Sequence, residues 1–335
     1  MTTRIGINGF GRIGRSYLRA ALANNADIEV VAINDVTNVE TLASLLEWDS
    51  ISGHLDGVSV SDGQLVVGDR AIKVFSERDP ARIPWSQAGV DVVIESTGFF
   101  TKADAARAHL QGGARKVIVS APAKGDAPAI VLGVNTDSID VDASDVFSNG
   151  SCTTNCLAPM VKVLNDAFGI ETGFMNTVHA YTSDQRLHDA PHSDLRRARA
   201  AALSTIPTTS GAASTIGKII PELDGKLTGF ALRVPVPVGS ITDLTVVLNR
   251  ETTVEEVNEA FRKAAESSDL SHYLAYSEAP IVSSDIVGNP HSVIFDAPLT
   301  EVIGKHVKVL GWYDNEWGFS NRLVELSELV GGRLS

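Results

Sequence analysis

The two cysteines of the chain, Cys152 and Cys156, lie four positions apart in the stretch SNGSCTTNCLAP, residues 148–159. Cysteine thiols form disulfide bonds, bind metal ions or act as nucleophiles. Two cysteines in a chain of 335 residues do not make the disulfide framework of small secreted proteins. Their spacing also differs from the C-x-x-C of zinc sites, so no metal site is expected. The remaining choice for each cysteine is between covalent chemistry and packing in the core.

A helix is predicted at this point, because apolar residues recur at helical spacing from residue 151 to residue 168. Ser151 or Cys152 lies at its N-terminus, where unpaired backbone N–H groups and the helix dipole favour a negative charge. A thiol in that place is expected to lose its proton more easily. Cys156 lies one turn further on, on the apolar face, where it is expected to be a small core residue. That face also carries Met160, Val163, Leu164 and Phe168.

His179 is the candidate base for Cys152. It lies near the end of a strand-like run, ETGFMNTVHAY (171–181), 27 residues after Cys152. A single cysteine with a histidine elsewhere in the sequence is a known pattern of nucleophile and base. The spacing alone leaves open whether the two side chains touch, so a purely structural role for each stays an alternative.

The N-terminal residues have the pattern of a dinucleotide-binding unit. A β-rich run, residues 4–9, leads into Gly9-Phe10-Gly11-Arg12-Ile13-Gly14, and a helix is predicted after it. In such a unit the first glycine allows a tight turn, the second lets a pyrophosphate approach, and the third lets helix and strand pack closely. The free N–H groups at the start of the helix hold the phosphates. A glycine-rich turn without a ligand is the alternative.

Asp35 follows the second apolar run, IEVVAIN (28–34), 21 residues after Gly14. A carboxylate in this place accepts hydrogen bonds from the adenosine ribose and repels a 2′-phosphate, which favours NAD over NADP. Two further apolar runs, 90–98 and 115–123, end in small polar residues. Ligands of doubly wound sheets lie outside the carboxyl ends of the strands, so four residues are predicted to line the cofactor: Ser96, Thr97, Gly98 and Ser120.

A helix is predicted between these two strands, over TKADAARAHLQGGAR. Thr101 is a suitable N-cap residue, and Gly112-Gly113 is a suitable end. Together with the runs on either side, this segment continues the alternation of strands and helices that is typical of a doubly wound α/β sheet.

The charge of the chain limits its partners. It has 28 Lys and Arg against 41 Asp and Glu, a formal net charge of −13. Nucleic acid is not expected as the main partner, because phosphate-backbone binding needs a basic face. A small anionic substrate needs only local cations, and DLRRAR (194–199) and Arg233 are candidates. A solvated helix face is the alternative for the first of these.

Length and composition indicate a two-domain globular protein. The N-terminus lacks the basic and apolar regions of a signal peptide. No stretch approaches the roughly 18 apolar residues that a membrane span needs. A cytoplasmic enzyme without a membrane partner is therefore expected.

Seven motifs occur in the order and spacing of one enzyme family: INGFGRIGR, SCTTNC, HAYTSDQ, DLRRARAAA, TTSGAA, RVPVP and WYDNEWGFSNR. Over essentially its whole length the chain resembles the phosphorylating glyceraldehyde-3-phosphate dehydrogenases of glycolysis and gluconeogenesis. The resemblance implies that Cys152 attacks the aldehyde to form a thiohemiacetal, with His179 as the base. Hydride transfer to NAD then gives a thioester, which inorganic phosphate cleaves to an acyl phosphate.

The resemblance also implies which residues bind the ligands. The substrate's phosphate would lie at Thr182 and Arg233, with Arg197 nearby and Asp184 as a buttress of this site. The attacking phosphate would lie at Ser151, Thr153, Ser210 and Gly211. The NAD site would comprise Gly9, Gly11, Arg12, Ile13, Gly14, Asp35, Arg78, Ser96, Gly98 and Ser120, with Asn315 holding the nicotinamide amide. Turn and helix-cap chemistry is the alternative for Thr182 and Ser210.

The implied fold class is α/β, with a Rossmann NAD-binding domain and an α+β catalytic domain whose sheet is mixed and mainly antiparallel. The NAD-binding domain would span residues 1–151, joined by a C-terminal helix at 317–335, and the catalytic domain residues 152–316. Family members are homotetramers, in which the segment from about residue 180 to residue 203 reaches toward a neighbouring subunit's cofactor site.

Four residues depart from the commoner family pattern: Gly150, Ser183, Ser210 and Phe319. They suggest an inhibitor-tolerant paralogue as one alternative, because three of them cluster around the expected active site. Erythrose-4-phosphate dehydrogenase is a second alternative, which Thr182 disfavours. A non-catalytic NAD-dependent binding protein is a third, which the intact Cys152 and His179 disfavour.

Overall fold

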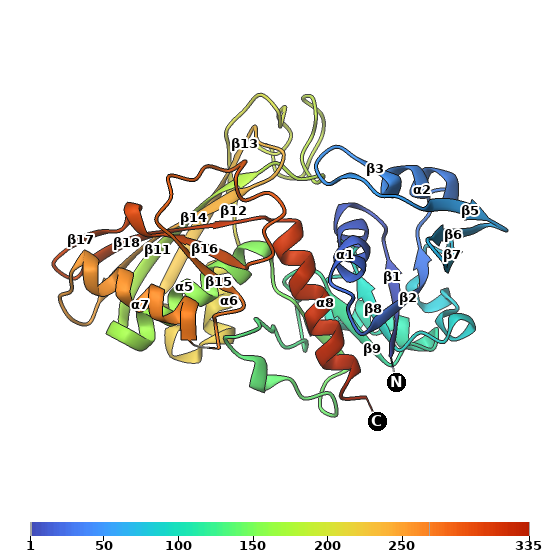
Figure 1. The fold of residues 1–335 in the computed structure, drawn as a ribbon, viewed down its shortest axis with the longest axis horizontal. Coiled ribbons are helices and arrows are strands. Elements are labelled where there is room, and N and C mark those ends of the chain that lie inside the picture. The colour runs from blue at the N-terminus through green and yellow to red at the C-terminus, as the bar shows by residue number, and fades with distance from the viewer. Residues whose placement is uncertain (1, 268, 335) are drawn as a thin grey trace. The chain divides into compact units, whose positions relative to one another are not determined.

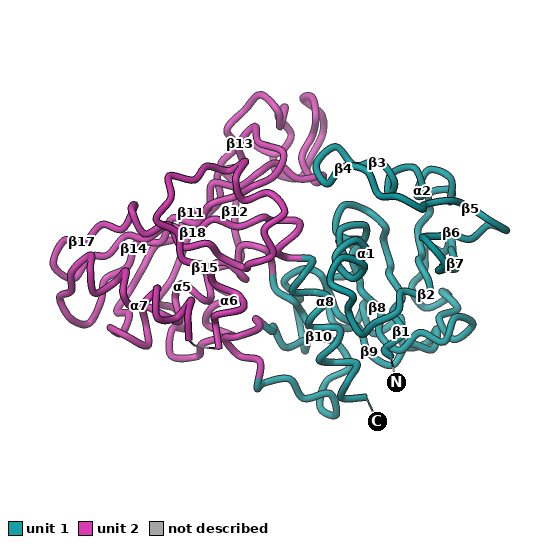
Figure 2. Tube along the Cα trace, viewed as in Figure 1, with its two compact units in different colours: residues 1–130, 137–150, 320–335 teal, residues 131–136, 151–319 magenta. Residues whose placement is uncertain are grey.

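The computed structural model describes residues 2–267 and 269–334. The chain forms two compact units, which Figure 2 draws in teal and magenta. Unit 1 consists of residues 1–130, 137–150 and 320–335, and unit 2 of residues 131–136 and 151–319. Within the described residues, no helix is both long and apolar enough to cross a bilayer.

Unit 1 is built on an eight-stranded sheet with the strand order β10-β9-β8-β1-β2-β7-β6-β5 (Figure 1). Neighbouring strands from β10 to β7 run parallel, and β6 and β5 extend the sheet as antiparallel strands. The strands are β1 (Thr3–Asn8), β2 (Ile28–Asn34), β5 (Val58–Ser61), β6 (Gln64–Val67), β7 (Arg70–Phe75), β8 (Val92–Glu95), β9 (Lys116–Val119) and β10 (Val146–Ser148). A separate pair is formed by β3 (Trp48–Asp49) and β4 (Gly53–His54).

The chain order places a topological switch point beside β1. From β1 the chain crosses to β2 on one side, and it returns later to β8 on the other side. Ligands of open α/β sheets bind at such a point, outside the carboxyl ends of the strands. The helices of this unit are α1 (Arg12–Ala23), α2 (Val39–Glu47), α3 (Ala103–Ala106), α4 (Ala108–Gln111) and, from residue 320 onward, α8 (Trp317–Gly331).

The turn between β1 and α1 needs its glycines. Gly9 has a φ of +89°, in the left-handed region that side chains disfavour. A Cβ on Gly14 would lie 2.4 Å from the carbonyl oxygen of Gly9. Glycine at both positions therefore lets α1 start close against the end of β1, as the sequence pattern predicted.

The single helix predicted over residues 101–112 is wrong. The segment forms two short helices, α3 and α4, and the N-cap residue is Lys102 rather than Thr101. The backbone of Thr101 and Ala103 instead bonds to that of Lys124, in a short parallel bridge. The bridge places Lys102 directly before α3, so Thr101 lies one residue before the N-cap position.

Unit 2 contains a mixed sheet with the strand order β12-β13-β11-β14-β18-β16-β15, and β17 pairs with β18. The pairs β11–β13 and β15–β16 are parallel and the other pairs are antiparallel. The strands are β11 (Ile170–Ala180), β12 (Ile206–Thr209), β13 (Leu227–Val234), β14 (Ser240–Leu248), β15 (Leu274–Ser277), β16 (Val293–Asp296), β17 (Glu301–Ile303) and β18 (His306–Tyr313). The predicted fold class is confirmed by the two sheets.

Helices α5 (Cys152–Phe168), α6 (Ala212–Ile219) and α7 (Val254–Ser267) pack against this sheet (Figure 1). The helix predicted to begin at Ser151 or Cys152 is confirmed: α5 begins at Cys152, with Ser151 as its N-cap, and Cys156 is fully buried in its core face. Single-turn 3₁₀ helices occur in both units: η1 (Pro80–Arg82), η2 (Trp85–Ala88), η3 (Thr136–Ser138), η4 (Pro221–Leu223) and η5 (Ala297–Leu299).

The alternation of side chains along β11 decides which residues face α5. Met175, Thr177 and His179 are buried, whereas Phe174 lies on the opposite, exposed face. A strand turns successive side chains to opposite faces of its sheet, so His179 shares the buried face with Met175 and Thr177. The end of β11 and the start of α5 therefore meet inside unit 2.

Candidate active site

Cys152 and His179 are in contact. The Sγ atom of Cys152 lies 3.3 Å from Nε2 of His179. Cys152 is the first residue of α5, whose N-cap Ser151 accepts a hydrogen bond from the backbone N–H of Thr154 at 3.0 Å. His179 is 3% exposed near the end of β11. The fold thus brings together the two residues whose contact the sequence could not establish.

The imidazole of His179 is oriented by a carbonyl group. Its Nδ1 lies 2.7 Å from the backbone oxygen of Ala180, which can only accept a hydrogen bond. NH1 of Arg233, which can only donate, lies 3.1 Å from the same Nδ1, but it also donates to the Ala180 oxygen and to Oγ1 of Thr182. The shorter contact, to the Ala180 oxygen, assigns the proton of the neutral ring to Nδ1, so the lone pair of Nε2 faces the thiol of Cys152. This is the tautomer that a base for that thiol needs.

The surroundings of Cys152 and His179 favour the neutral form of each side chain. Burial and the charge of Arg233 lower the pKa of His179 to about 3. Burial also raises the pKa of the Cys152 thiol, and Arg233 and the backbone N–H of Thr153 only partly oppose this. The expectation that the helix N-terminus would give an acidic thiol is wrong, because desolvation outweighs the nearby donors. A thiol proton must therefore move to His179 when Cys152 attacks.

The lowered pKa of His179 predicts that the protein loses stability in mild acid. Below about pH 6.5 the unfolded chain protonates this residue while the folded protein keeps it neutral, so falling pH favours the unfolded state. The free energy of unfolding should fall by up to about 1.4 kcal/mol per pH unit from this residue alone. Calorimetric midpoints between pH 5 and 7 should fall less steeply for His179→Asn than for the wild type. Equal slopes would contradict the pKa shift.

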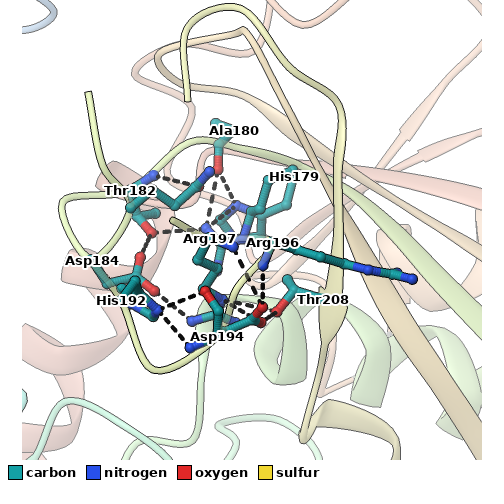
Figure 3. A network of polar contacts seen from close by, with 11 residues as sticks. His179, Ala180, Thr182, Asp184, His192, Asp194, Arg196, Arg197 and Thr208 are labelled. Atoms are coloured by element: carbon teal, nitrogen blue, oxygen red, sulfur yellow. Dashed lines mark hydrogen bonds and ion pairs between the residues drawn. The ribbon is translucent and has the colours of Figure 1, made fainter. Parts of the chain in front are cut away.

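Arg233 links the histidine to a second polar cluster. Figure 3 shows this cluster beside His179, with Thr182, Asp184 and Arg197 labelled. Its NH1 lies 3.1 Å from the Ala180 oxygen, 3.1 Å from Nδ1 of His179 and 2.9 Å from Oγ1 of Thr182. Thr182 donates in turn to Asp184, which is also paired with Arg197. Burial opposes ionisation of Asp184, but the Thr182 hydroxyl and the two arginines lower its pKa.

Arg197 is held on three sides. Besides Asp184, its Nε donates to the hydroxyl of Thr208 at 2.8 Å and lies 3.7 Å from a carboxylate oxygen of Asp194. Thr208 donates to the same Asp194 oxygen at 2.7 Å. Asp194 and Thr208 were not predicted as site residues, although Asp194 lies in the DLRRAR motif. The structure thus gathers Thr182, Asp184, Arg197 and Arg233 in one network next to His179.

The predicted residues of the attacking-phosphate site lie at the N-terminal ends of two helices, α5 and α6. Ser210 and Gly211 precede α6, and the hydroxyl of Ser210 accepts from the backbone N–H of Ala212 at 3.3 Å. A Cβ on Gly211 would meet no atom of the described residues within 4 Å, so the space at that position is open. Ser151 and Thr153 are at the N-terminus of α5.

Thr153 is bound to a residue that sequence reasoning missed. Its hydroxyl lies 2.8 Å from that of Tyr313, which is 2.7 Å from Oγ1 of Thr177. Because Thr177 donates to the Ile241 carbonyl, Tyr313 must donate to Thr177 and Thr153 to Tyr313. Tyr313 also packs edge-on against His179, with ring centroids 5.9 Å apart. Its place in the WYDNEWGFSNR motif was the available signal.

In unit 1 the glycine-rich turn leaves room for a phosphate. Gly11 is the N-cap of α1 and supplies no side-chain cap, and a Cβ there would lie more than 4 Å from every other atom in the part of the chain that the structure describes. Ile13 and Gly14 continue the first turn of α1. The N–H groups of a helix's first turn have no acceptor within the helix and suit an anion. The Arg12 side chain is paired with Asp49, so this guanidinium is already neutralised.

The other predicted cofactor residues of unit 1 lie at the carboxyl ends of the strands. Asp35 accepts from the backbone N–H groups of Phe10 (2.8 Å) and Thr37 (2.9 Å). The hydroxyl of Ser96 donates to Gly9 O at 2.7 Å, and that of Ser120 to Glu95 O at 3.0 Å. Gly98 is exposed with a φ of +77°, and Arg78 follows β7.

Asn315 lies in unit 2, just after β18, and is 4% exposed. Its Oδ1 accepts from the backbone N–H of Gly239 (3.1 Å) and from the hydroxyl of Ser240 (2.9 Å). The two donors identify this atom as the amide oxygen and hold the amide group of Asn315 in one orientation. Of the residues that depart from the family pattern, Gly150 has a φ of +64° and Phe319 is buried.

The comparisons with known proteins agree with this geometry. The model of the glyceraldehyde 3-phosphate dehydrogenase NAD binding domain matches residues 3–103, and that of the C-terminal domain of the same enzyme matches residues 151–315. Glyceraldehyde-3-phosphate dehydrogenase 1 of Streptomyces avermitilis is 59% identical over the full length of both chains. The glyceraldehyde-3-phosphate dehydrogenases of Streptomyces coelicolor (59%) and Mycobacterium bovis (58%) are also similar over the full length of both chains. The chain belongs to the glyceraldehyde-3-phosphate dehydrogenase family, whose N-terminal domain binds NAD.

Proposed function

We propose that this protein oxidises glyceraldehyde 3-phosphate to an acyl phosphate, with NAD and inorganic phosphate as co-substrates. The observation that carries the proposal is the contact of 3.3 Å between Cys152 Sγ and His179 Nε2, beside a network that contains two arginines. Full-length relatives named as this enzyme support it. The erythrose-4-phosphate alternative receives no such support.

The chemistry begins at Cys152. As its sulfur attacks the aldehyde carbon, the thiol proton moves to Nε2 of His179 and a thiohemiacetal forms. NAD, when bound, accepts the hydride of that carbon. His179 passes the thiol proton to the new alkoxide oxygen, which completes the thiohemiacetal, and takes it back from the hydroxyl group as hydride leaves and the thioester forms. A phosphate oxygen then attacks the thioester carbonyl, the C–S bond breaks, and the sulfur regains a proton from His179.

Arg233 is the proposed principal contact of the substrate's phosphate. Its guanidinium holds Thr182 and Ala180 through NH1, while its Nε has no hydrogen-bond partner among the described residues. A buried donor without an acceptor favours an anion. Arg197 is already neutralised by Asp184 and Asp194, so we assign it and Asp184 a supporting role.

Arg233→Gln should lower kcat/KM for glyceraldehyde 3-phosphate by about 10- to 100-fold, because it removes a charged hydrogen bond to the phosphate. For glyceraldehyde, which has no phosphate, the loss should be much smaller. Steady-state kinetics with the two aldehydes measure the difference. Arg196→Gln is the matched control, since Arg196 is an exposed neighbour with the same charge. An equal loss for both aldehydes would contradict the assignment.

For the attacking phosphate we propose Ser151, Ser210 and the backbone of Gly211. Their hydroxyl and N–H groups suit an anion, and the Cβ position of Gly211 is open. The hydroxyl of Thr153 donates to Tyr313, so Thr153 contributes a donor to phosphate only if this bond is exchanged.

The residues of unit 1 fit NAD. The open space at the Cβ position of Gly11 and the N-terminus of α1 suit the pyrophosphate, and the carboxylate of Asp35 suits the adenosine ribose. We propose that Arg12, Ile13, Arg78, Ser96, Gly98 and Ser120 line this site. For Asn315 we propose a bond to the nicotinamide amide, which its fixed orientation would support.

Asp35→Asn should raise the NADP-to-NAD ratio of kcat/KM by about 10-fold or more. The substitution removes the negative charge that repels a 2′-phosphate, while the amide oxygen can still accept one of the two backbone bonds. Initial rates with each cofactor measure the ratio. Asp62→Asn, in an exposed turn of unit 1, is the control for a loss of charge. An unchanged ratio would show that Asp35 does not select the cofactor.

We propose that the protein is a cytoplasmic homotetramer. Large apolar side chains are exposed on the segment 180–203, namely Leu187 (74%), Leu195 (82%) and Leu203 (83%), and on the open face of the sheet, namely Phe174 (69%) and Phe230 (49%). Such surfaces are typical of subunit interfaces. Light scattering coupled to gel filtration measures the mass, and a monomer at micromolar concentration would refute the tetramer.

One assay tests the proposed function as a whole. Purified protein is mixed with NAD and glyceraldehyde 3-phosphate or erythrose 4-phosphate, with and without phosphate. Sustained NADH formation that needs phosphate and prefers the triose is the expected result. No NADH with any aldehyde would refute the proposal and favour a non-catalytic binding protein.

A further inference from the structure

Unit 1 contains a buried ionisable pair that the reaction does not use. Glu95, the last residue of β8, is 2% exposed, and His109 of α4 is 0% exposed. Nε2 of His109 lies 2.9 Å from Oε2 of Glu95. A buried carboxyl group is costly unless every oxygen is bound to donors, so its partners reveal what it holds in place.

The proton positions of this pair follow from Trp85. The indole N–H of Trp85, which can only donate, lies 3.1 Å from Nδ1 of His109. Nδ1 is therefore the acceptor, and Nε2 carries the proton that is donated to Glu95. His109 is a neutral donor with one possible tautomer, and the rings of Trp85 and His109 are packed in the core of the unit.

The carboxylate of Glu95 faces the predicted cofactor loops. Its Oε1 accepts from both the backbone N–H (2.9 Å) and the hydroxyl of Thr97. A Cβ on Gly9 would lie 2.8 Å from the Thr97 nitrogen, so these two turns are in close contact. Between them, the Ser96 hydroxyl donates to Gly9 O. Glu95 thus fixes the loop that packs on the glycine-rich turn.

The other oxygen extends the network to two more strands. Oε2 accepts from Nδ2 of Asn8 at 2.6 Å, at the end of β1. Oδ1 of Asn8 accepts from Asn34 at 2.8 Å, at the end of β2. Asn34 in turn bonds both the N–H (2.9 Å) and the carbonyl (2.8 Å) of Glu77, next to Arg78. One buried carboxylate therefore joins the carboxyl ends of β8, β1 and β2 and the loop after β7.

We propose that Glu95, oriented by His109, is a positioning residue for NAD. Four donors bind its two oxygens: Nδ2 of Asn8, the N–H and hydroxyl groups of Thr97, and Nε2 of His109. Asn8 precedes the glycine-rich turn, and Thr97 lies between the proposed cofactor residues Ser96 and Gly98. Glu95 holds these loops in their binding geometry before NAD arrives, which lowers the ordering cost of binding. The proposal rests on the NAD site described above, and it assigns Glu95 no part in the chemistry at Cys152.

Glu95→Gln is the decisive variant, because it keeps the size and changes the hydrogen bonding. The glutamine amide can adopt two orientations. In one, its NH₂ group faces the N–H of Thr97, and in the other it faces the donors of Asn8 and His109, so each orientation opposes donor to donor. His109 cannot become an acceptor without losing Trp85. The Kd for NAD, measured by titration calorimetry on the full-length protein, should rise about 10-fold or more. The rate of Cys152 alkylation by iodoacetamide without NAD should change less than about twofold.

Two further variants separate positioning from stability. Val93→Ala, two residues earlier on the same face of β8, removes buried apolar atoms and no polar group of the network, so it should lose stability and leave the Kd unchanged. Thr97→Val removes one donor to Glu95 at a half-buried position, so it should fold and raise the Kd several-fold. An unchanged Kd in Glu95→Gln or, if that variant does not fold, in Thr97→Val would overturn the proposal. So would an equal rise in Val93→Ala. A wild type that does not bind NAD would instead refute the cofactor site itself.

Discussion

Cys152→Ser should lower kcat by about 10⁴-fold or more, while the Kd for NAD stays within about twofold of the wild type. A serine hydroxyl is a far weaker nucleophile than a thiol, and its proton is harder to transfer to an imidazole whose pKa burial and Arg233 lower to about 3. NADH formation measured under saturating substrates gives kcat, and calorimetry gives the Kd. Thermal unfolding should be little changed, because serine is close to cysteine in size.

Cys156→Ala is the matched control for this result. Cys156 lies one turn along the same helix, where burial raises its pKa to about 12 and its Sγ lies 3.5 Å from the Gly311 carbonyl. It cannot act as a thiolate at neutral pH, so kcat should stay within a few-fold. If Cys156→Ala abolished activity and Cys152→Ser retained it, the assignment of the nucleophile would be wrong.

His179→Asn should lower kcat at pH 7 by about 10²- to 10⁴-fold, the usual contribution of a general base. It should also change the shape of the pH profile. Without the imidazole, Cys152 must ionise by itself, and burial raises the pKa of its thiol. The rate of the variant should therefore rise about tenfold per pH unit through the alkaline range. The wild type should show a much flatter profile above neutrality.

The pH–rate profile distinguishes a base from a structural residue. A histidine that only supports the fold would, when replaced, lower the rate at every pH by the same factor. Parallel profiles for the wild type and His179→Asn would thus contradict the proposed proton transfer. Alkylation of Cys152 by iodoacetamide at several pH values offers an independent measure of the same thiol pKa.

Much of the fold could be predicted from local patterns. The helix after Cys152 was found because its apolar residues recur at helical spacing, and the turn at Gly9 because glycines tolerate backbone that other residues do not. The prediction of a single helix over residues 101–112 failed because the first residues of this segment pair with Lys124, which is remote in sequence. Helical propensity carries no information about such pairing.

The site was predictable in its residue types and not in its contacts. The pairing of Cys152 with His179 depends on the alternation along β11 and on how α5 packs, neither of which spacing reveals. An acidic thiol was expected because the sequence indicates that Cys152 lies at a helix N-terminus but does not indicate how deeply it is buried. Burial is the larger effect and raises the pKa of the thiol. Tyr313 and Glu95 were missed for the same reason, since each acts through partners far away in the chain.

The most direct test is to mix the protein with NAD and glyceraldehyde 3-phosphate in the absence of phosphate. One equivalent of NADH per subunit should form in a burst, and peptide mass spectrometry after an acid quench should find the acyl group on Cys152. Added phosphate should then release it as the acyl phosphate. An acyl group on Cys156, or NADH formed without any acylated peptide, would contradict covalent catalysis by Cys152.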